Sequence, residues 1–257
     1  MSCTPVQITR QSVEIALANS EFVPFYQPIV DSNGQISAVE VLMRWEESPG
    51  RFISAKHFIP ALENVGLLSV VTSELLKKVA QDLSCATTTK QHLSVYINFS
   101  PRQIQKADFV YECFALLERM NLNLCSLVIE ITESLPLTNL DSVKRNMQRL
   151  KLAGVKFFLD DFGCGHSNLA LLQKLDVEGI KIDKRFINDV IRNPDSKIIT
   201  KFIIELAHSL NLEVIAEGIE SVEQMKMLTE MGAHKYQGYY VSEPLEIRQL
   251  EKLMLLS

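Results

Sequence analysis

The sequence predicts an α/β protein whose strands close into a barrel, and two observations support this. Apolar runs typical of buried strands alternate with stretches typical of helices along most of the 257 residues. Eight runs qualify as strands, and several are apolar almost throughout, which indicates a parallel sheet covered by helices. Because no Pro/Gly/Ser-rich linker interrupts the alternation, we expect residues 1–257 to form one domain.

A hairpin opens the series of elements. FVPFYQPIV (22–30) and QISAVEVLMRW (35–45) flank DSNG, a turn-rich tetrapeptide typical of an antiparallel pair. The further strands are expected at 93–99, 126–132, 155–160, 179–182, 212–217 and near 235–240. Helices are expected between them, around 69–84, 102–119, 139–153, 168–174, 196–210 and 221–231.

Composition limits the classes of function. Hydrophobic residues make up 47% and charged residues 22%, as in ordinary globular proteins. The net charge of −5 and the pI near 5.6 argue against a DNA or RNA polymer as partner, which would require a basic face.

Location is also indicated by the sequence. The five cysteines are scattered without a CxxC pair, as in reduced cytosolic proteins. No apolar run is long enough for a membrane span, and residues 1–20 do not resemble a signal peptide. We expect a cytoplasmic protein, or the cytoplasmic domain of a longer one.

Polar residues recur where the expected strands end. These residues are Asn98, Glu130, Asp160, Lys181, Glu217 and Gln237. Glu40 lies inside the apolar stretch AVEVLMRW, which supplies no evident partner for a buried carboxylate. Since barrel enzymes carry their chemistry at the carboxyl ends of the strands, we expect these side chains to meet there.

The adjacent Asp160 and Asp161 would point to opposite faces of a regular strand. The following GCG allows the backbone to leave β geometry, so that both carboxylates can face one site; alone, the pair could equally be a solvated turn. With Glu40, Glu130 and Glu217 they supply five negative charges, and such oxygen ligands suit Mg²⁺ or Mn²⁺. Two such ions would suit phosphoester hydrolysis.

The residues alone leave alternatives open. Lys181 could form a buried pair with Asp183, or offset charge on a phosphate. Glu217 and Glu220 could instead be acids at a helix N-terminus. The histidines show no ligand spacing, although His166 follows the paired aspartates closely. Another metal-dependent barrel enzyme, such as an aldolase or an enolase-like enzyme, also fits the acidic set.

The ordered motifs resemble those of the EAL domain, the bacterial cyclic-di-GMP phosphodiesterase family. From about Phe22 to Pro244 the chain carries, in the family's order, YQPIV, EVLMRW, HFIPALENVGLL, INFSPRQ, IEITES, LDDFGCGHSNLALL, IKID, AEGIES and QGYYVSEP. The resemblance implies a TIM-like (β/α)8 barrel with one antiparallel strand near the N-terminus. It also implies hydrolysis of cyclic di-GMP to linear pGpG with two Mg²⁺ or Mn²⁺ ions, and inhibition by Ca²⁺.

Matching motifs imply a role for each site residue. The metal ligands would be Glu40, Asn98, Glu130, Asp160, Asp161 and Glu217. Lys181 would contact the nucleophilic water, and Glu220 and Gln237 would support the metal and water network. Glu133 would steady the loop after the paired aspartates. The residues that hold the dinucleotide would be Gln27, Leu42 and Arg44, with Arg44 pairing with a phosphate.

Four positions depart from the family pattern. Val41 replaces the signature alanine, and Cys164, His166 and Asn168 replace the usual Thr, Tyr and Ser. Val41 should point away from the site by its odd spacing from Glu40. The other three lie in the loop 162–168, which the family links to dimerisation, so we expect a homodimer through this loop. We predict an active phosphodiesterase; the alternative is a catalytically silent cyclic-di-GMP receptor or protein-interaction scaffold.

Overall fold

The strands of the barrel come from the whole length of the chain. The computed structural model describes residues 8–85, 93–119, 125–132, 140–164 and 168–255. The strands are β1 (Phe22–Asp31), β2 (Ile36–Ser48), β3 (Arg51–Ser54), β4 (Leu93–Phe99), β5 (Cys125–Thr132), β6 (Lys156–Phe162), β7 (Gly179–Ile182), β8 (Glu213–Ala216) and β9 (Lys235–Tyr236).

The predicted barrel and its antiparallel strand are both confirmed. The sheet has the order β1-β9-β8-β7-β6-β5-β4-β2-β3, and β1 also pairs with β2, which closes a ring of eight strands and leaves β3 outside it. β1 runs antiparallel to both of its neighbours, and the other pairs within the ring are parallel. The hairpin turn forms at DSNG, where the Asp31 side chain accepts hydrogen bonds from the backbone N–H groups of Asn33 and Gln35.

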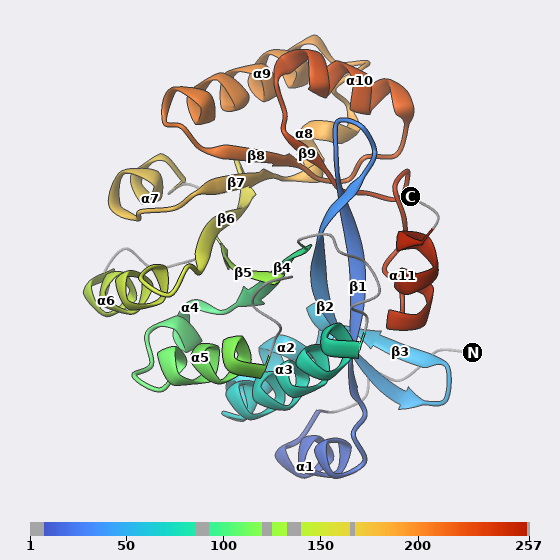
Figure 1. Ribbon diagram of the computed structural model, residues 1–257, viewed down its shortest axis with the longest axis vertical. Helices are drawn as coiled ribbons and strands as arrows, with labels where there is room; N and C mark the ends of the chain where they lie inside the picture. The colour runs from blue at the N-terminus through green and yellow to red at the C-terminus, as the bar shows by residue number, and fades with distance from the viewer. Residues whose placement is uncertain (1–7, 86–92, 120–124, 133–139, 165–167, 256–257) are drawn as a thin grey trace.

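Helices surround the ring (Figure 1). They are α1 (Arg10–Ala18), α2 (Ala55–Asn64), α3 (Leu68–Cys85), α4 (Pro101–Ile104), α5 (Phe109–Arg119), α6 (Leu140–Lys151), α7 (Asn168–Lys174), α8 (Lys184–Asn188), α9 (Pro194–Ser209), α10 (Val222–Met231) and α11 (Ile247–Met254). Local signals set several boundaries: Ser221 and Gln224 form a capping box at the start of α10, and Gly232 ends it at φ 99°. No described helix combines the length and apolarity needed to cross a membrane.

Two predicted elements are wrong in extent. The helix expected over 102–119 is two helices, α4 and α5. The side chain of Asn146 donates to the carbonyls of Ile104 and Lys106, at 2.7 and 2.9 Å, and so binds the chain where the first helix ends. The strand expected near 235–240 is only β9, because Gln237 and Tyr240 turn to make backbone hydrogen bonds with Ile219.

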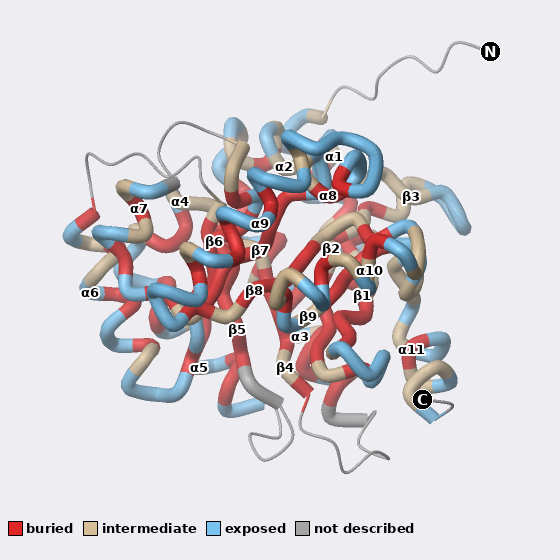
Figure 2. The backbone as a smooth tube through the Cα atoms, turned by 90° about the horizontal axis from the view of Figure 1, so that it is seen from above, coloured by how far each residue is buried: buried red, intermediate tan, exposed pale blue. Residues whose placement is uncertain are grey.

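The apolar core has two parts. The larger part lies between the strands and the helices, and Figure 2 shows the strands buried while the outward turns of the helices are exposed. The smaller part is a cluster on the inward faces of the strands, formed by Ile29, Ala38, Tyr96, Val128, Phe158 and Ile215. The Tyr96 and Phe158 rings meet edge to face at 5.2 Å. Gly179 makes room for Phe158, since a Cβ there would lie 2.2 Å from its ring. We call this cluster the apolar layer.

Candidate active site

A polar layer follows the apolar layer inside the same barrel. Most of its side chains lie two positions beyond an apolar-layer residue on the same strand or its extension, since strand side chains alternate between faces. These residues are Gln27, Glu40, Asn98, Glu130, Asp160 and Glu217, and Lys181 joins them from β7. Strand register sets several contacts: Gln27 lies opposite Glu40, and Asn98 opposite Glu130. The expected meeting of these strand-end residues therefore occurs.

Lys181 is the centre of the polar layer. Its side chain is fully buried, and its Nζ lies 3.0 Å from a Glu40 carboxylate oxygen and 2.7 Å from one of Glu130. The same Nζ lies 2.6 Å from Glu217 and 3.7 Å from Asp160. The alternative pair with Asp183 is absent from the described ion pairs; the Asp183 carboxylate instead pairs with Arg185 at 3.1 Å.

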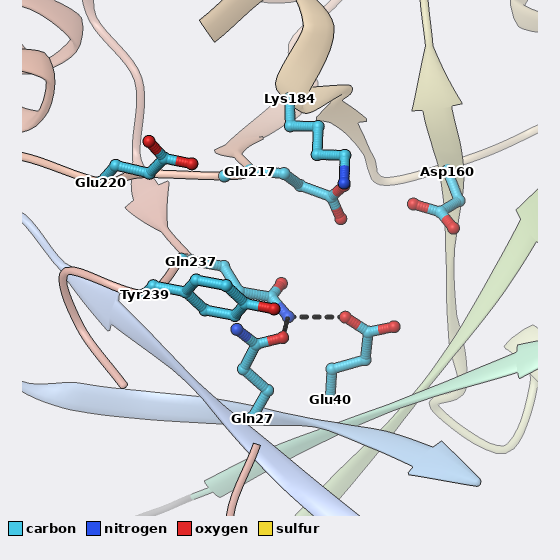
Figure 3. Close-up of a pocket in the computed structure, with 10 residues that line it drawn as sticks. Gln27, Glu40, Asp160, Lys184, Glu217, Glu220, Gln237 and Tyr239 are labelled. Atoms are coloured by element: carbon cyan, nitrogen blue, oxygen red, sulfur yellow. Dashed lines mark hydrogen bonds between the residues drawn. The ribbon is translucent and has the colours of Figure 1, made fainter. Parts of the chain in front are cut away.

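Two neutral amides, Asn98 and Gln237, donate hydrogen bonds to the carboxylates. The Asn98 side chain donates to both Glu40 and Glu130 at 2.7 Å. The Gln237 side chain donates to Glu40 at 2.6 Å and to the Gln27 side chain at 3.1 Å, as the dashed lines of Figure 3 show. Because the Asn98 nitrogen is directed at acceptors, its carbonyl oxygen is what this residue can offer to a cation.

The paired aspartates sit at an irregularity of β6. Asp161 has φ 54°, and the pairing of β6 with β7 shifts register between Leu159 and Phe162. Ligand oxygens of Asp160, Asp161 and Glu217 consequently lie within 4.8 Å of one another. Leaving β geometry thus brings adjacent carboxylates to one site, as the sequence predicted, and both Asp161 and Gly163 of the following GCG, at φ 106°, have positive φ.

The carboxylates of the polar layer outnumber the positive charges beside them, and their pKa values are shifted. Burial, together with the neighbouring charges of Asp160 and Glu40, raises the pKa of Glu217 to about 8. Burial and the adjacent Asp160 raise the pKa of Asp161 to about 7. The pKa of Glu130 is raised by burial and by Glu40. Burial also favours proton uptake by Glu40, but Lys181 and the hydrogen bonds from Gln237 and Asn98 outweigh it and lower its pKa.

This donor set fits divalent cations. Five carboxylates and one ammonium give a formal charge of −4 (−5 + 1), which two divalent ions would balance. The Oδ1 atom of Asp160 is buried, has no hydrogen-bond partner among the described residues and lies 3.7 Å from the Lys181 ammonium, which leaves it able to bind a further cation. An all-oxygen set suits Mg²⁺ or Mn²⁺. Glu40, Asn98, Glu130, Asp160, Asp161 and Glu217 are the residues that would hold the ions.

A cavity of about 250 Å³ opens beside the polar layer. Its lining is Gln27, Glu40, Asp160, Lys184, Glu217, Gly218, Glu220, Gln237, Gly238 and Tyr239, most of which Figure 3 labels. Glu220 reaches this cavity from the turn before α10. The sequence analysis did not identify Lys184 or Tyr239. Lys184 directly follows the motif IKID and Tyr239 lies within QGYY, and these positions are the signal that could have found them.

Two of the three expected substrate residues line cavities: Gln27 lines the cavity just described, and Leu42 lines another. Leu42 lines a second cavity of about 530 Å³, which also reaches Asn98, Asp160 and Asp161. Arg44 lines neither of these two cavities: its guanidinium donates to the Met43 carbonyl and lies over the Phe25 ring at 5.8 Å.

Some predicted residues lie outside the described part of the chain. These are Glu133 and His166, and the side chain of Asn168 is likewise not described. The predicted homodimer loop 162–168 is described only in part, at Phe162, Gly163 and Cys164 and in the backbone of Asn168.

Comparison with known proteins gives the family. The family model of the EAL domain matches residues 10–244 of this chain. The chain is 36% identical over 256 residues to the probable cyclic di-GMP phosphodiesterase PdeG of Escherichia coli K12, covering 99% of this chain and 50% of PdeG. It is 33% identical over 240 residues to the cyclic di-GMP phosphodiesterase PdeL of the same organism, covering 93% of this chain and 66% of PdeL. The chain thus spans half the length of PdeG.

Solved structures agree with this assignment. The PaMucR phosphodiesterase in complex with c-di-GMP superposes with a TM-score of 0.84 at 30% identity, covering 93% of this chain and 98% of that one. The EAL enzyme Bd1971, bound to cAMP and cyclic di-GMP, superposes with a TM-score of 0.87 at 30% identity, covering 95% and 67%. Three features agree with the family: the sequence match, the eight-stranded barrel with one antiparallel strand, and the carboxylates of the polar layer. This chain belongs to the EAL domain family.

Proposed function

We propose that this chain hydrolyses cyclic di-GMP to linear pGpG at the polar layer of its barrel, with two bound Mg²⁺ or Mn²⁺ ions. The observation that carries the proposal is the ring of carboxylates, which consists of the four around Lys181 together with Asp161. With Lys181 it has a formal charge of −4, which two divalent cations would balance. The names of PdeL and of the PaMucR complex support cyclic di-GMP as the substrate.

The ions would supply a water activated for attack and charge stabilisation on the phosphate. The chain's own residues fix the surroundings. Asn98 and Gln237 hold Glu40 in one orientation through hydrogen bonds of 2.7 and 2.6 Å. Lys181, buried among four carboxylates, stays protonated, because their charges outweigh the burial that would lower its pKa. In this proposal its ammonium contacts the attacking water and offsets negative charge that develops on the phosphate.

Further parts of the proposal concern the surroundings of the site. Gln27, Leu42 and Arg44 are proposed to hold the dinucleotide, with Glu220 and Gln237 supporting the water network and Glu133 steadying the following loop. Ca²⁺ is proposed to inhibit, because it accepts less regular coordination than Mg²⁺. We also propose one domain over 1–257, a homodimer through the loop 162–168, and a cytoplasmic location.

The test is product analysis. Purified protein is incubated with cyclic di-GMP and Mn²⁺ or Mg²⁺, and the products are identified by mass. We expect pGpG, and we expect Glu40→Ala to lower turnover by about 1,000-fold or more, because it removes a ligand and a Lys181 partner together. Glu205→Ala is the matched control, since Glu205 pairs with Lys201 on the exposed face of α9.

Three results would contradict the proposal. Absence of pGpG from the wild type with either ion, at concentrations where a dimer forms, would sink it. Tight binding of cyclic di-GMP without turnover would instead identify a silent receptor. Full activity of Glu40→Ala would show that the reaction occurs elsewhere.

A further inference from the structure

The cavity beside the polar layer contains a cation that no step above uses. Among its ten lining residues, four are acids, namely Glu40, Asp160, Glu217 and Glu220, and one is a base, Lys184. Figure 3 shows the Lys184 side chain extending from α8 into the space that Glu217 also enters, across the cavity from Glu40. A cation in this position faces any anion that reaches the polar layer through the cavity.

Two other cations close to the polar layer, Lys181 and Arg44, have their charge engaged, and a third, Lys56, lines the cavity that contains Leu42 and not this one. Lys181 is fully buried and lies within 3.0 Å of three carboxylates. Arg44 donates to a backbone carbonyl and covers the Phe25 ring, and it lines neither this cavity nor the one that contains Leu42. Lys184 differs, because within the described part of the chain no ion pair or side-chain hydrogen bond holds its ammonium.

The stem of Lys184 is nevertheless fixed in place. It is the first residue of α8, directly after Asp183, whose carboxylate accepts from the Arg185 backbone at 2.7 Å and pairs with the Arg185 side chain. On its other side lies Gly218, where a Cβ would come within 2.4 Å of the Lys184 Cβ. Gly218 has φ 68°, and this turn directly follows Glu217. The stem of Lys184 is thus packed against the turn beside Glu217, while no partner among the described residues engages its ammonium.

A cyclic dinucleotide carries two phosphodiesters. Only the phosphodiester that is being hydrolysed can lie at the ring of carboxylates. The other carries a negative charge into a cavity lined by acids, where it would be repelled unless a cation meets it. We propose that Lys184 binds the phosphate that is not being hydrolysed, and so positions the cyclic dinucleotide with its other phosphate at the ring of carboxylates. This inference rests on the proposed function, and it deepens it by naming a substrate-binding residue.

The contact between Lys184 and the second phosphate should contribute to substrate binding more than to the chemical step. A contact to the distant phosphate is made equally in the bound substrate and in the transition state, so its loss raises KM with little change in kcat. A Lys–phosphate contact is a charge-assisted hydrogen bond at a half-open site, and its loss should weaken binding by about ten-fold.

The test compares the wild type with Lys184→Met, Lys184→Arg and Lys197→Met, the last replacing an exposed lysine on α9. Affinity for cyclic di-GMP is measured by calorimetry with Ca²⁺ in the site, and KM and kcat are measured with Mn²⁺. We expect Lys184→Met to raise Kd and KM about ten-fold with kcat within about three-fold, Lys184→Arg to restore most of the affinity, and Lys197→Met to match the wild type.

An unchanged Kd in Lys184→Met would overturn the inference, as would a fall in kcat at unchanged KM, which would place Lys184 at the reacting phosphate. A wild type that binds cyclic di-GMP but forms no pGpG would contradict the proposed function and leave the Kd comparison to decide the role of Lys184. A wild type that neither binds nor cleaves would overturn both.

Discussion

The apolar and polar layers lie inside one barrel, two residues apart on shared strands, and they are held together by different forces. Ile29, Ala38 and Phe158 fill the barrel by packing, whereas Gln27, Glu40 and Asp160 on the same strands are held by ion pairs and amide hydrogen bonds. The apolar layer is complete without any ligand. The polar layer has an excess of negative charge, so we expect bound protons or cations to stabilise it.

This difference separates stability from function within one core. Packing of the apolar layer fixes where the strands end, and the strand ends fix where the carboxylates lie. The excess charge then costs stability, because buried like charges repel and each loses its hydration. A site that binds metals tightly is therefore one that the metal-free protein tolerates poorly.

The largest effect should follow removal of the central ammonium. Lys181→Met leaves Glu40, Glu130 and Glu217 buried with no counter-charge, and we expect a loss of about 3–5 kcal/mol in the free energy of unfolding without metal. Turnover with Mn²⁺ should fall by about 100-fold or more, because a preorganised charge at the phosphate is lost. Urea unfolding in EDTA and in Mn²⁺, together with product formation, measures both effects.

The matched contrast is Phe158→Ala in the apolar layer. It opens a cavity beside Tyr96 and Gly179, at a cost of about 3–5 kcal/mol that Mn²⁺ should not offset. Mn²⁺ should instead recover part of the stability lost in Lys181→Met, since the ions supply the missing positive charge. If Mn²⁺ restored the stability of Lys181→Met and Phe158→Ala equally, or of neither variant, the two layers would not differ in their dependence on cations.

A smaller effect concerns pH and metal together. The folded-state pKa values of Asp161 and Glu217, about 7 and about 8, lie above those of an unfolded chain. Between roughly pH 4.5 and 8 the folded protein holds protons that the unfolded chain has released, so metal-free stability falls as pH rises through this window. Glu217 should contribute most, because Asp161 is exposed and its charge is screened by solvent.

Metal binding should reverse that trend, since the ions replace the bound protons. We expect Mn²⁺ to raise the melting temperature by a few degrees more at about pH 8 than at about pH 6. Thermal unfolding in EDTA and in Mn²⁺ at both pH values measures the difference, and Glu217→Gln should reduce it. A shift by Mn²⁺ that is the same at both pH values would count against a site built from carboxylates with raised pKa values.

The polar layer could be predicted because its signal is local. A carboxylate or amide at the end of an apolar run is visible in the sequence, and parallel strands bring such ends together whatever the details of packing. The break between α4 and α5 could not be predicted in the same way. Its cause is Asn146, which contacts the chain 42 residues away at Ile104.

Lys184 and Tyr239 were missed for a related reason. They lie on a short helix and in a turn, where no hydrophobic period indicates which way a side chain points, and they reach the cavity only through tertiary placement. The position of the Arg44 side chain could not be predicted either. The motif implied a phosphate as its partner, and only the tertiary structure shows that its guanidinium lies over the Phe25 ring.

The smallest effect should come from the residue that departs from the family signature. Val41 is buried, belongs to the core between strands and helices, and lies opposite Ile97 of β4 and Tyr26 of β1. Glu40 belongs to the polar layer inside the barrel, so the two neighbours face different cores, as their odd spacing predicts. Val41→Ala should therefore cost about 1–2 kcal/mol of stability through lost packing, with kcat within about two-fold.

Thermal or urea unfolding and steady-state kinetics check the Val41 prediction. KM is the parameter to follow, since Val41 also lines the cavity that contains Leu42. A change in KM below about three-fold would fit a residue that packs behind the site, because a contact that does not reach the phosphate carries little binding energy. A ten-fold change in kcat would instead mean that packing outside the barrel moves Glu40, and that the polar layer depends on both cores.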